Sequence, residues 1–339
     1  MSVYDLESVD PDAANTSHAL VLEQVGTGAR VLDIGCSTGF LGEVLIERGC
    51  TVDGVEVDPD AAEIARKRGL RTVTVMDLDR EDLAATLEGQ QYDRIILADV
   101  LEHLMRPGAV LAAASTLLAP GGQIVISVPN VTHGSLRLAL LQGRWDYRDT
   151  GLLDRTHIRF FTQESILALV EEAGLQVARL RSTIVDPLAS EVELDRDALL
   201  PEIVEWVRSE PSSFDYQFIL VVEKIAPGQV RRPSPALEQA VVLPEMVEAA
   251  ENGRALLLEK AALAAEITSL RRKVLTMRDH AVGAEAELGT ARRERAIMER
   301  KLAQAEHDVA ELRASASWRV GQMVVAPMSK VRRAIRGSA

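Results

Sequence analysis

Seven short apolar runs, rich in β-branched residues, recur through the first two thirds of the chain. Between the first five of them lie stretches whose apolar positions are three and four residues apart, which is the helical period. Strands that alternate with helices predict βαβ units and a sheet with both faces covered. The pattern therefore predicts one doubly wound α/β domain. The runs are RVLDIG, TVDGVEV, RTVTVMD, DRIILAD, QIVISV, QVARLRS and DYQFILVVE.

The chain after about residue 226 has a different pattern. Five Pro and Gly positions within 226–244 rule out a long helix there, so we interpret this stretch as a linker. Beyond it, apolar positions alternate at spacings of three and four for more than six heptads, which is typical of a coiled coil. These a and d positions are Leu263, Ile267, Leu270, Val274, Met277, Ala281, Ala284, Leu288, Ala291, Arg295, Met298, Leu302, Ala305, Val309 and Leu312.

An isolated helix this polar has marginal stability in water. The row of apolar a and d positions therefore predicts a partner helix, and hence a homo-oligomer. The alternative is a single long helix that lies back on the first domain. The spacing is nearer 3.5 than 3.6 residues, which favours self-association. Arg295 at an a position would lower stability while fixing the register.

Charge divides the chain at about the same place. Residues 1–230 carry 19 Lys and Arg against 37 Asp and Glu, whereas residues 231–339 carry 19 against 14. An acidic body is a poor surface for nucleic acid, because neutralisation of phosphates dominates that affinity. No acid follows Glu311, and the tail 317–339 mixes apolar with basic residues. This composition predicts peripheral contact with an anionic membrane, with a solvated basic end as the alternative.

Other features of the sequence concern the compartment. No apolar run approaches the roughly 20 residues that span a bilayer. The start, MSVYDLESVDPD, lacks the basic and apolar regions of a signal peptide. Two cysteines, Cys36 and Cys50, cannot build a disulfide framework. We therefore expect a cytoplasmic protein.

The strongest chemical signal is the run Val31–Phe40, where a strand ends in Asp33 and a turn with Gly35 and Gly39 leads into a helix. Such a turn lets backbone approach a ligand closely, and it also fits NAD enzymes. The dinucleotide-binding motif G-x-G-x-x-G requires a small residue at its last position, where this chain has Phe40, so the turn fits that class poorly. Three more acids close predicted strands, where ligands of open α/β sheets bind. They are Glu56, Asp77 and Asp99, and together with the turn they predict a nucleoside pocket.

These motifs resemble those of class I S-adenosylmethionine-dependent methyltransferases over about residues 15–225. VLDIGCSTG matches the cofactor loop, GVEVD the ribose acid and VMD the acid beside adenine, while LEHL and the PGG turn are specific to the family. The family's usual second loop glycine is Ser37 here. The resemblance implies S-adenosylmethionine as cofactor and a Rossmann-like, seven-stranded, mostly parallel sheet with an antiparallel last strand. The implied cofactor-binding residues are Asp33, Gly35, Cys36, Ser37, Gly39, Glu56, Val57, Asp77, Leu78 and Asp99.

The segment GRWDYRDTGLLDRTHIRFFTQESILALVEEAGL, with its LDRTHIRFFT stretch, resembles methyltransferases of bacterial surface-polysaccharide machinery. This resemblance implies a small-molecule or lipid-linked saccharide acceptor in cell-envelope glycan biosynthesis. Methyl transfer to a hydroxyl needs a base. We predict His157 in that role, with Asp154 orienting it; His133 and His103 are weaker candidates.

A metal-dependent mechanism must also be weighed. Asp99, Glu102 and His103 resemble the acid-x-x-Glu-His run of quinone-biosynthesis O-methyltransferases, where a divalent ion is implied. Packing at the start of a helix explains the same run, and we predict no metal. The predicted organisation is a methyltransferase domain at 1–225, a linker at 226–244, a coiled coil at 245–316 and a basic amphipathic tail at 317–339.

Three other functions are weighed against a glycan O-methyltransferase. A quinone-type or other small-molecule O-methyltransferase is one. A coiled-coil scaffold with a vestigial methyltransferase fold is another, although the intact acids and glycines argue against decay. A nucleic-acid methyltransferase is disfavoured, because LADVLE stands where exocyclic-amine methylation needs an N/D-P-P-Y type of motif.

Overall fold

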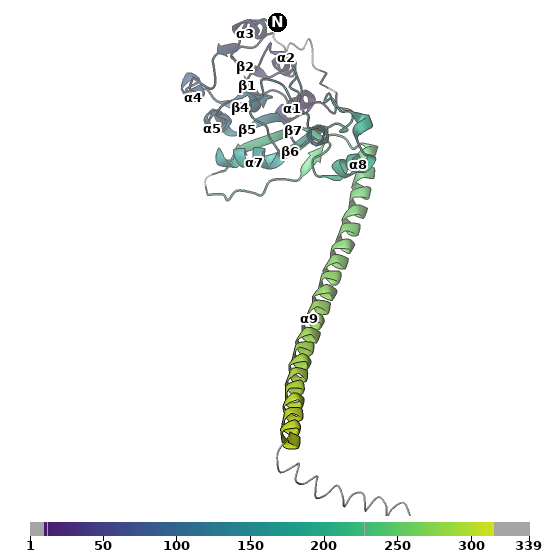
Figure 1. The fold of residues 1–339 in the computed structure, drawn as a ribbon. Helices are drawn as coiled ribbons and strands as arrows, with labels where there is room; N and C mark the ends of the chain where they lie inside the picture. Colours follow the sequence, from purple (N-terminus) through teal and green to yellow (C-terminus); the bar gives the residue numbers. More distant parts are fainter. Residues whose placement is uncertain (1–9, 12, 227, 315–339) are drawn as a thin grey trace, which may run out of the picture. The chain divides into compact units, whose positions relative to one another are not determined.

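The computed structural model describes residues 10–11, 13–226 and 228–314, so the predicted tail at 317–339 lies outside the described residues (Figure 1). The chain divides into two units, with the boundary between Leu257 and Leu258. The first unit contains the sheet, and the second contains most of one long helix.

A single sheet runs through the first unit in the order β3-β2-β1-β4-β5-β7-β6-β8. Strands β1 to β5 are parallel, and β7 is antiparallel to both β5 and β6. The doubly wound, mostly parallel sheet with an antiparallel β7 is thus confirmed. The strands are β1 (Arg30–Ile34), β2 (Thr51–Glu56), β3 (Thr72–Val75), β4 (Tyr92–Ala98), β5 (Leu118–Pro129), β6 (Leu175–Ile184), β7 (Asp215–Lys224) and β8 (Leu237–Gln239).

The predicted number of seven strands is wrong, because β8 adds an eighth. This strand lies inside the stretch 226–244 that the sequence suggests is a linker, and it pairs parallel with β6 from Leu180 to Ser182. Prolines precede β8 in the sequence and argue against a regular element there, and a strand of three residues is too short to show a periodic pattern. The exposed edge of β6 supplies the hydrogen bonds that order it.

Helices cover both faces of the sheet. Helices α1, α2 and α3 pack on one face and α4, α5 and α7 on the other. Alternation along β1 separates the two cores, since Val31 belongs to the first and Leu32 to the second. The helices of the first unit are α1 (Ser17–Val25), α2 (Phe40–Glu47), α3 (Pro59–Lys67), α4 (Leu83–Thr86), α5 (Pro107–Thr116), α6 (Gly134–Leu141), α7 (Gln163–Glu172) and α8 (Pro201–Ser209), with short 3-10 turns η1 (Leu101–His103) and η2 (Arg196–Ala198).

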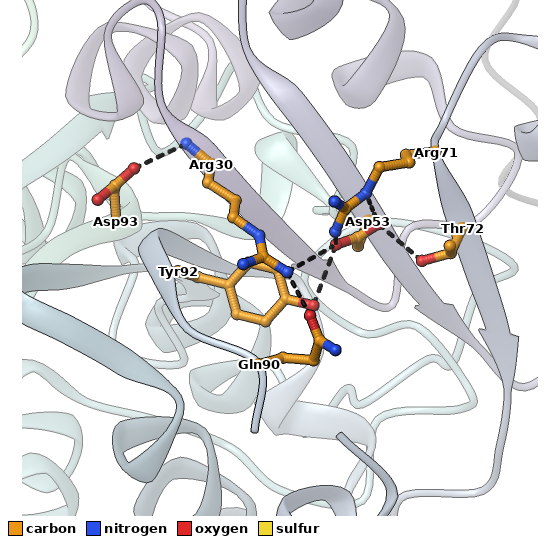
Figure 2. Close-up of polar contacts among 7 residues, drawn as sticks. All are labelled: Arg30, Asp53, Arg71, Thr72, Gln90, Tyr92 and Asp93. Atoms are coloured by element: carbon orange, nitrogen blue, oxygen red, sulfur yellow. Dashed lines mark hydrogen bonds and ion pairs between the residues drawn. The ribbon is translucent and has the colours of Figure 1, made fainter. Parts of the chain in front are cut away.

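An ionic cluster around the buried Asp53 of β2 ties together the starts of β1, β3 and β4 (Figure 2). Asp53 accepts hydrogen bonds from Arg71 Nε at 2.9 Å, Thr72 Oγ1 at 2.6 Å and Tyr92 Oη at 3.1 Å. Burial pushes the pKa of Asp53 up, but these donors and the Arg71 charge outweigh it and lower the pKa. The Arg30 guanidinium stacks over the Tyr92 ring. The cluster therefore fastens the amino ends of the strands, opposite the ends that carry the predicted site.

Helix α9 (Pro244–Ala314) follows β8 and crosses into the second unit. The large apolar side chains at its described a and d positions are 46% to 68% exposed. The structure thus shows the long helix that the sequence predicts, while its pairing into a coiled coil stays a prediction. Within the described residues, no helix combines the length and hydropathy that a membrane crossing requires.

Candidate active site

A pocket of about 700 Å³ opens at the carboxyl ends of the parallel strands. The strand order reverses between β1 and β4, and the segments that follow these two strands both line the pocket. This is the switch point at which open α/β sheets bind ligands. Residues at the ends of β2 and β3 also line the pocket, and so do residues of the segment 150–157.

The turn after β1 depends on three residues in the left-handed region. Gly35 has φ +74°, Ser37 +49° and Gly39 +83°. A Cβ at Gly35 would lie 2.6 Å from Val100 Cγ2, and one at Gly39 would lie 2.9 Å from the Ala65 backbone. Glycine is therefore required at both places. Ser37, which stands where the family usually has glycine, also has a positive φ, and the turn forms with serine at this position.

Glu56 joins the turns after β1 and β2. Its Oε2 accepts a hydrogen bond from Ser37 N at 2.8 Å, and its Oε1 accepts from Val57 N at 2.8 Å and Asp58 N at 2.9 Å. Three donors leave about one of the carboxylate's four acceptor positions for a ligand hydroxyl. Val57 itself is exposed and contributes its backbone. The predicted ribose acid is thus held rigidly at the pocket wall.

Asp33 is the most strongly perturbed acid beside the turn. Its side chain is buried, it lines the pocket, and its Oδ2 atom has no hydrogen-bond partner among the described residues. Burial, and secondly the charge of Glu56, raise its pKa to about 7. Burial likewise raises the pKa of the neighbouring Cys36 thiol, which keeps that group protonated and unsuited to nucleophilic attack. A cationic ligand would supply the counter-charge that Asp33 lacks.

The acids after β3 and β4 also reach the pocket. Asp77 Oδ1 accepts from Asp79 N at 3.0 Å, and Leu78 lines the pocket beside it. Asp99 has φ +55° and receives hydrogen bonds from Gln217 of β7 and, at 3.2 Å, from Ser127 Oγ. An antiparallel strand far along the chain therefore orients an acid that the sequence places at the end of β4.

The predicted base lies in the same pocket. His157 is 8% exposed, and its Nδ1 is 3.4 Å from the Leu152 carbonyl oxygen. A proton on Nδ1 leaves Nε2 as the acceptor. Burial, and then the nearby His103, lower the pKa of His157, against an upward pull from Asp154. The ring is therefore neutral at pH 7, as a base must be. Asp154 is buried beside it and accepts from Thr156 N at 2.7 Å.

Glu102 and His103 of η1 meet His157, although 54 residues separate the two histidines. One ligating atom from each of the three lies within 4.8 Å of the others, and the two imidazoles stack edge to face. The Glu102 backbone carbonyl accepts from Ile158 N and Arg159 N, both at 2.9 Å, which fixes the later segment over η1. This group of donors would suit a divalent ion.

The Glu102 carboxyl is buried, and neither of its oxygens has a hydrogen-bond partner among the described residues. Burial, and then the charge of Asp99, raise its pKa well above the ordinary value. A neutral carboxyl and a bound cation each account for such a group. The expected absence of a metal accordingly stays a prediction.

Nearly all the predicted site residues converge on the pocket. Gly39 is the exception, because it packs against α3 and lets α2 approach. The weaker candidate His133 caps α6, and its Nε2 lies 2.9 Å from the Val185 carbonyl oxygen, so it serves packing. Sequence reasoning missed lining residues whose positions carry no motif, among them Ser17, His18, Tyr216 and Gln217. The predicted residues that line the pocket are Asp33, Gly35, Cys36, Ser37, Glu56, Val57, Asp77, Leu78, Asp99, Asp154 and His157.

This arrangement agrees with comparisons to known proteins. The profile of a methyltransferase domain family matches residues 10–180, which is half of the chain. The chain belongs to this methyltransferase family. Its cofactor is S-adenosylmethionine. The acceptor position that Glu56 keeps for a ligand hydroxyl, and the Asp33 Oδ2 atom that has no partner among the described residues, fit a cationic nucleoside.

Curated relatives of this methyltransferase carry one recurrent name. The ubiquinone biosynthesis O-methyltransferase of Cereibacter sphaeroides is 32% identical over 188 residues, covering 53% of this chain and 74% of that enzyme. The enzyme of the same name from Aeromonas salmonicida is 28% identical over 185 residues, covering 54% and 78%. The polysaccharide association that the sequence suggests has no counterpart among these relatives.

Solved structures include a methyltransferase of Archaeoglobus fulgidus, 21% identical, covering 62% of this chain and 95% of that one, with a TM-score of 0.44. Another is magnesium protoporphyrin IX methyltransferase from Synechocystis with bound S-adenosylhomocysteine, 17% identical, covering 66% and 91%, with a TM-score of 0.43.

Proposed function

We propose that this methyltransferase methylates a hydroxyl group of a small molecule, and that His157 is the base. The observation that carries the proposal is the place of His157, which lines the cofactor pocket with a lowered pKa and an unused ring nitrogen. The names of the relatives support O-methylation of a small acceptor. A hydroxylated aromatic compound is the acceptor class these names favour.

The protein's part in such a reaction is positioning and proton transfer. S-adenosylmethionine supplies an activated methyl group together with its own leaving group. Glu56 and the glycine turn hold the nucleoside end of the pocket, while Asp33 supplies a counter-charge. His157 Nε2 takes the hydroxyl proton as the oxygen attacks, and Asp154 stabilises the resulting imidazolium through its charge. Orientation of the two reactants contributes the larger share of the acceleration.

A saccharide acceptor remains the second candidate, because the segment with LDRTHIRFFT, which resembles polysaccharide-associated methyltransferases, contributes lining residues to the pocket. Incubation with labelled S-adenosylmethionine and two acceptor panels, hydroxylated aromatics and lipid-linked saccharides, separates the candidates. Label transferred to the aromatic panel alone supports the proposal. Label found only in the saccharide panel would replace the acceptor class, and label in neither panel would favour the scaffold alternative.

Substitution of His157 tests the base. We expect His157→Gln to lower kcat by about 10²–10⁴-fold while the Kd for S-adenosylmethionine changes less than about twofold. His103→Gln is the comparison variant, since that ring lies beside His157 and lowers its pKa without being the assigned base, and it should lower kcat much less. The wild-type profile of kcat against pH should fall on the acid side as His157 becomes protonated, and the variant should lack this limb. A near-normal kcat in His157→Gln would reject the assignment.

A further inference from the structure

Helix α9 carries an apolar seam that the single chain leaves open. The large side chains at its described a and d positions are 46% to 68% exposed, and they recur at a 3.5-residue period over about 50 residues. A seam this long is stable in water when a second helix covers it. The order of large and small residues along the seam, together with the flanking charges, indicates which occupant fits.

A parallel pairing of two copies fills the seam poorly. In a parallel, in-register pair each a or d residue faces the same residue of the second copy. Ala284, Ala291 and Ala305 would then each face another alanine, which leaves three underfilled layers. Arg295 would face a second Arg295, so two like charges would meet in the core.

An antiparallel pairing removes these defects in one particular register. Antiparallel coiled coils place a positions opposite d positions, and Leu288 can lie opposite Ala291 of the second copy. The same register puts Val274 opposite Ala305 and Arg295 opposite Ala284. Every described alanine of the seam then faces a larger side chain. Large residues face large ones in the remaining described layers, which are Ile267 with Leu312, Leu270 with Val309 and Met277 with Leu302.

The charges beside the seam favour the same register. Positions e face e and positions g face g in an antiparallel pair. All three charged e pairs are attractive: Arg271 with Glu306, Arg278 with Glu299, and Glu285 with Arg292. Among the g pairs, Lys273 faces Asp308, and Glu287 opposite Glu294 is the one clear repulsion.

Neighbouring registers lose this complementarity. A shift by one heptad puts Arg278 opposite Arg292 in one direction, and Arg271 opposite Arg313 in the other. Alanine also returns opposite alanine, because a shift in the second direction brings Ala305 against another core alanine. Charge therefore disfavours both neighbouring registers, and packing disfavours one of them as well.

We propose that two copies of this protein associate through α9 as an antiparallel coiled coil centred between Gly289 and Thr290. In this dimer Leu263 of one chain is about 80 Å along the axis from Leu263 of the other, at a rise of about 1.5 Å per residue. The two catalytic units are thus joined to opposite ends of the paired helices. A parallel dimer would join both to the same end.

Charge reversal in the full-length protein tests the alignment. Glu285→Arg and Arg292→Glu each turn the two symmetry-related attractive contacts into repulsions. Each should raise the dimer Kd by about tenfold, measured by sedimentation velocity. The double variant restores both contacts and should return the Kd to within about threefold of wild type. Arg293→Glu, on the outer face of the helix, is the matched control and should leave the Kd unchanged.

A parallel dimer behaves differently, because Arg292 would then face Glu287 and the double variant would stay weakened. That result, or a monomeric wild-type protein at all concentrations, overturns the proposal. Disulfide trapping tests the direction separately. Val274→Cys chains mixed with Ala305→Cys chains of different length should form cross-linked heterodimers. Cross-linking of Ala305→Cys chains to one another would instead show a parallel dimer.

Discussion

Asp33 should make the cofactor-free protein less stable as the pH rises. Its carboxyl is buried without a partner for Oδ2 among the described residues, and its pKa is raised to about 7. In the unfolded chain the pKa of an Asp is about 3.9. The unfolded state therefore loses the proton first, and the stabilisation from keeping Asp33 neutral is present below about pH 4 and is lost between pH 4 and about 7.

The size of the effect follows from the two pKa values. About three pH units at about 1.4 kcal/mol each give a total loss near 4 kcal/mol, of which roughly 2–3 kcal/mol falls between pH 5 and pH 8. Asp33→Asn keeps the shape of the side chain and cannot ionise. The variant should therefore lack this contribution to the pH dependence and be more stable than wild type at pH 8.

Urea unfolding of both proteins at pH 5 and pH 8, followed by near-ultraviolet circular dichroism, measures the difference in slope. Titration of the histidines is common to both proteins and cancels. Bound cofactor should make wild type the more stable of the two proteins at pH 8, because the positive charge of the cofactor favours ionised Asp33. Calorimetry should then show wild-type affinity for S-adenosylmethionine rising from pH 6 to pH 8 and little such rise in Asp33→Asn. Identical pH slopes of stability in the two proteins would refute the reasoning.

Three further outcomes follow from the structure. Glu56→Gln should weaken S-adenosylmethionine binding by about 1–3 kcal/mol, because an amide cannot accept from both turns and a ribose hydroxyl; unchanged affinity in calorimetry would remove Glu56 from that role. Asp53→Asn should lower the free energy of unfolding by about 1–3 kcal/mol at pH 7 and by less near pH 3, because the lowered pKa of Asp53 stabilises the fold above about pH 4 and this stabilisation is lost as the pH falls further. Equal losses at both pH values in urea melts would contradict the role of the Arg71 pair. Turnover should survive dialysis against EDTA, because a protonated Glu102 needs no cation. The Glu102, His103 and His157 group would instead bind an ion if Mg²⁺ or Mn²⁺ restored activity lost on dialysis, and if elemental analysis found metal in wild type but not in Glu102→Gln.

The alternation of strands and helices, the glycine turn and the acids that end the strands could all be predicted from the amino-acid sequence. These features are local. An apolar run fixes its own strand, and a parallel sheet brings the ends of all such strands to one edge, which is why Asp33, Glu56, Asp77 and Asp99 could be predicted to share a pocket. The heptad spacing of α9 could be predicted in the same way, because it too depends on residues that are close together in the sequence.

Contacts between segments that are distant in the sequence could be known only from the folded chain. Folding places the Gln217 amide of the antiparallel β7 in hydrogen-bond contact with Asp99. It also brings His157 close to Glu102, two residues that the sequence analysis assigned to separate motifs. It also ordered β8, whose three residues carry no signal of their own. In each case the deciding partner lies far along the chain, and its approach depends on the packing of the whole sheet rather than on any local pattern. The pKa values of Asp33 and Glu102 follow the same rule, since burial raises them and burial is a property of the folded chain.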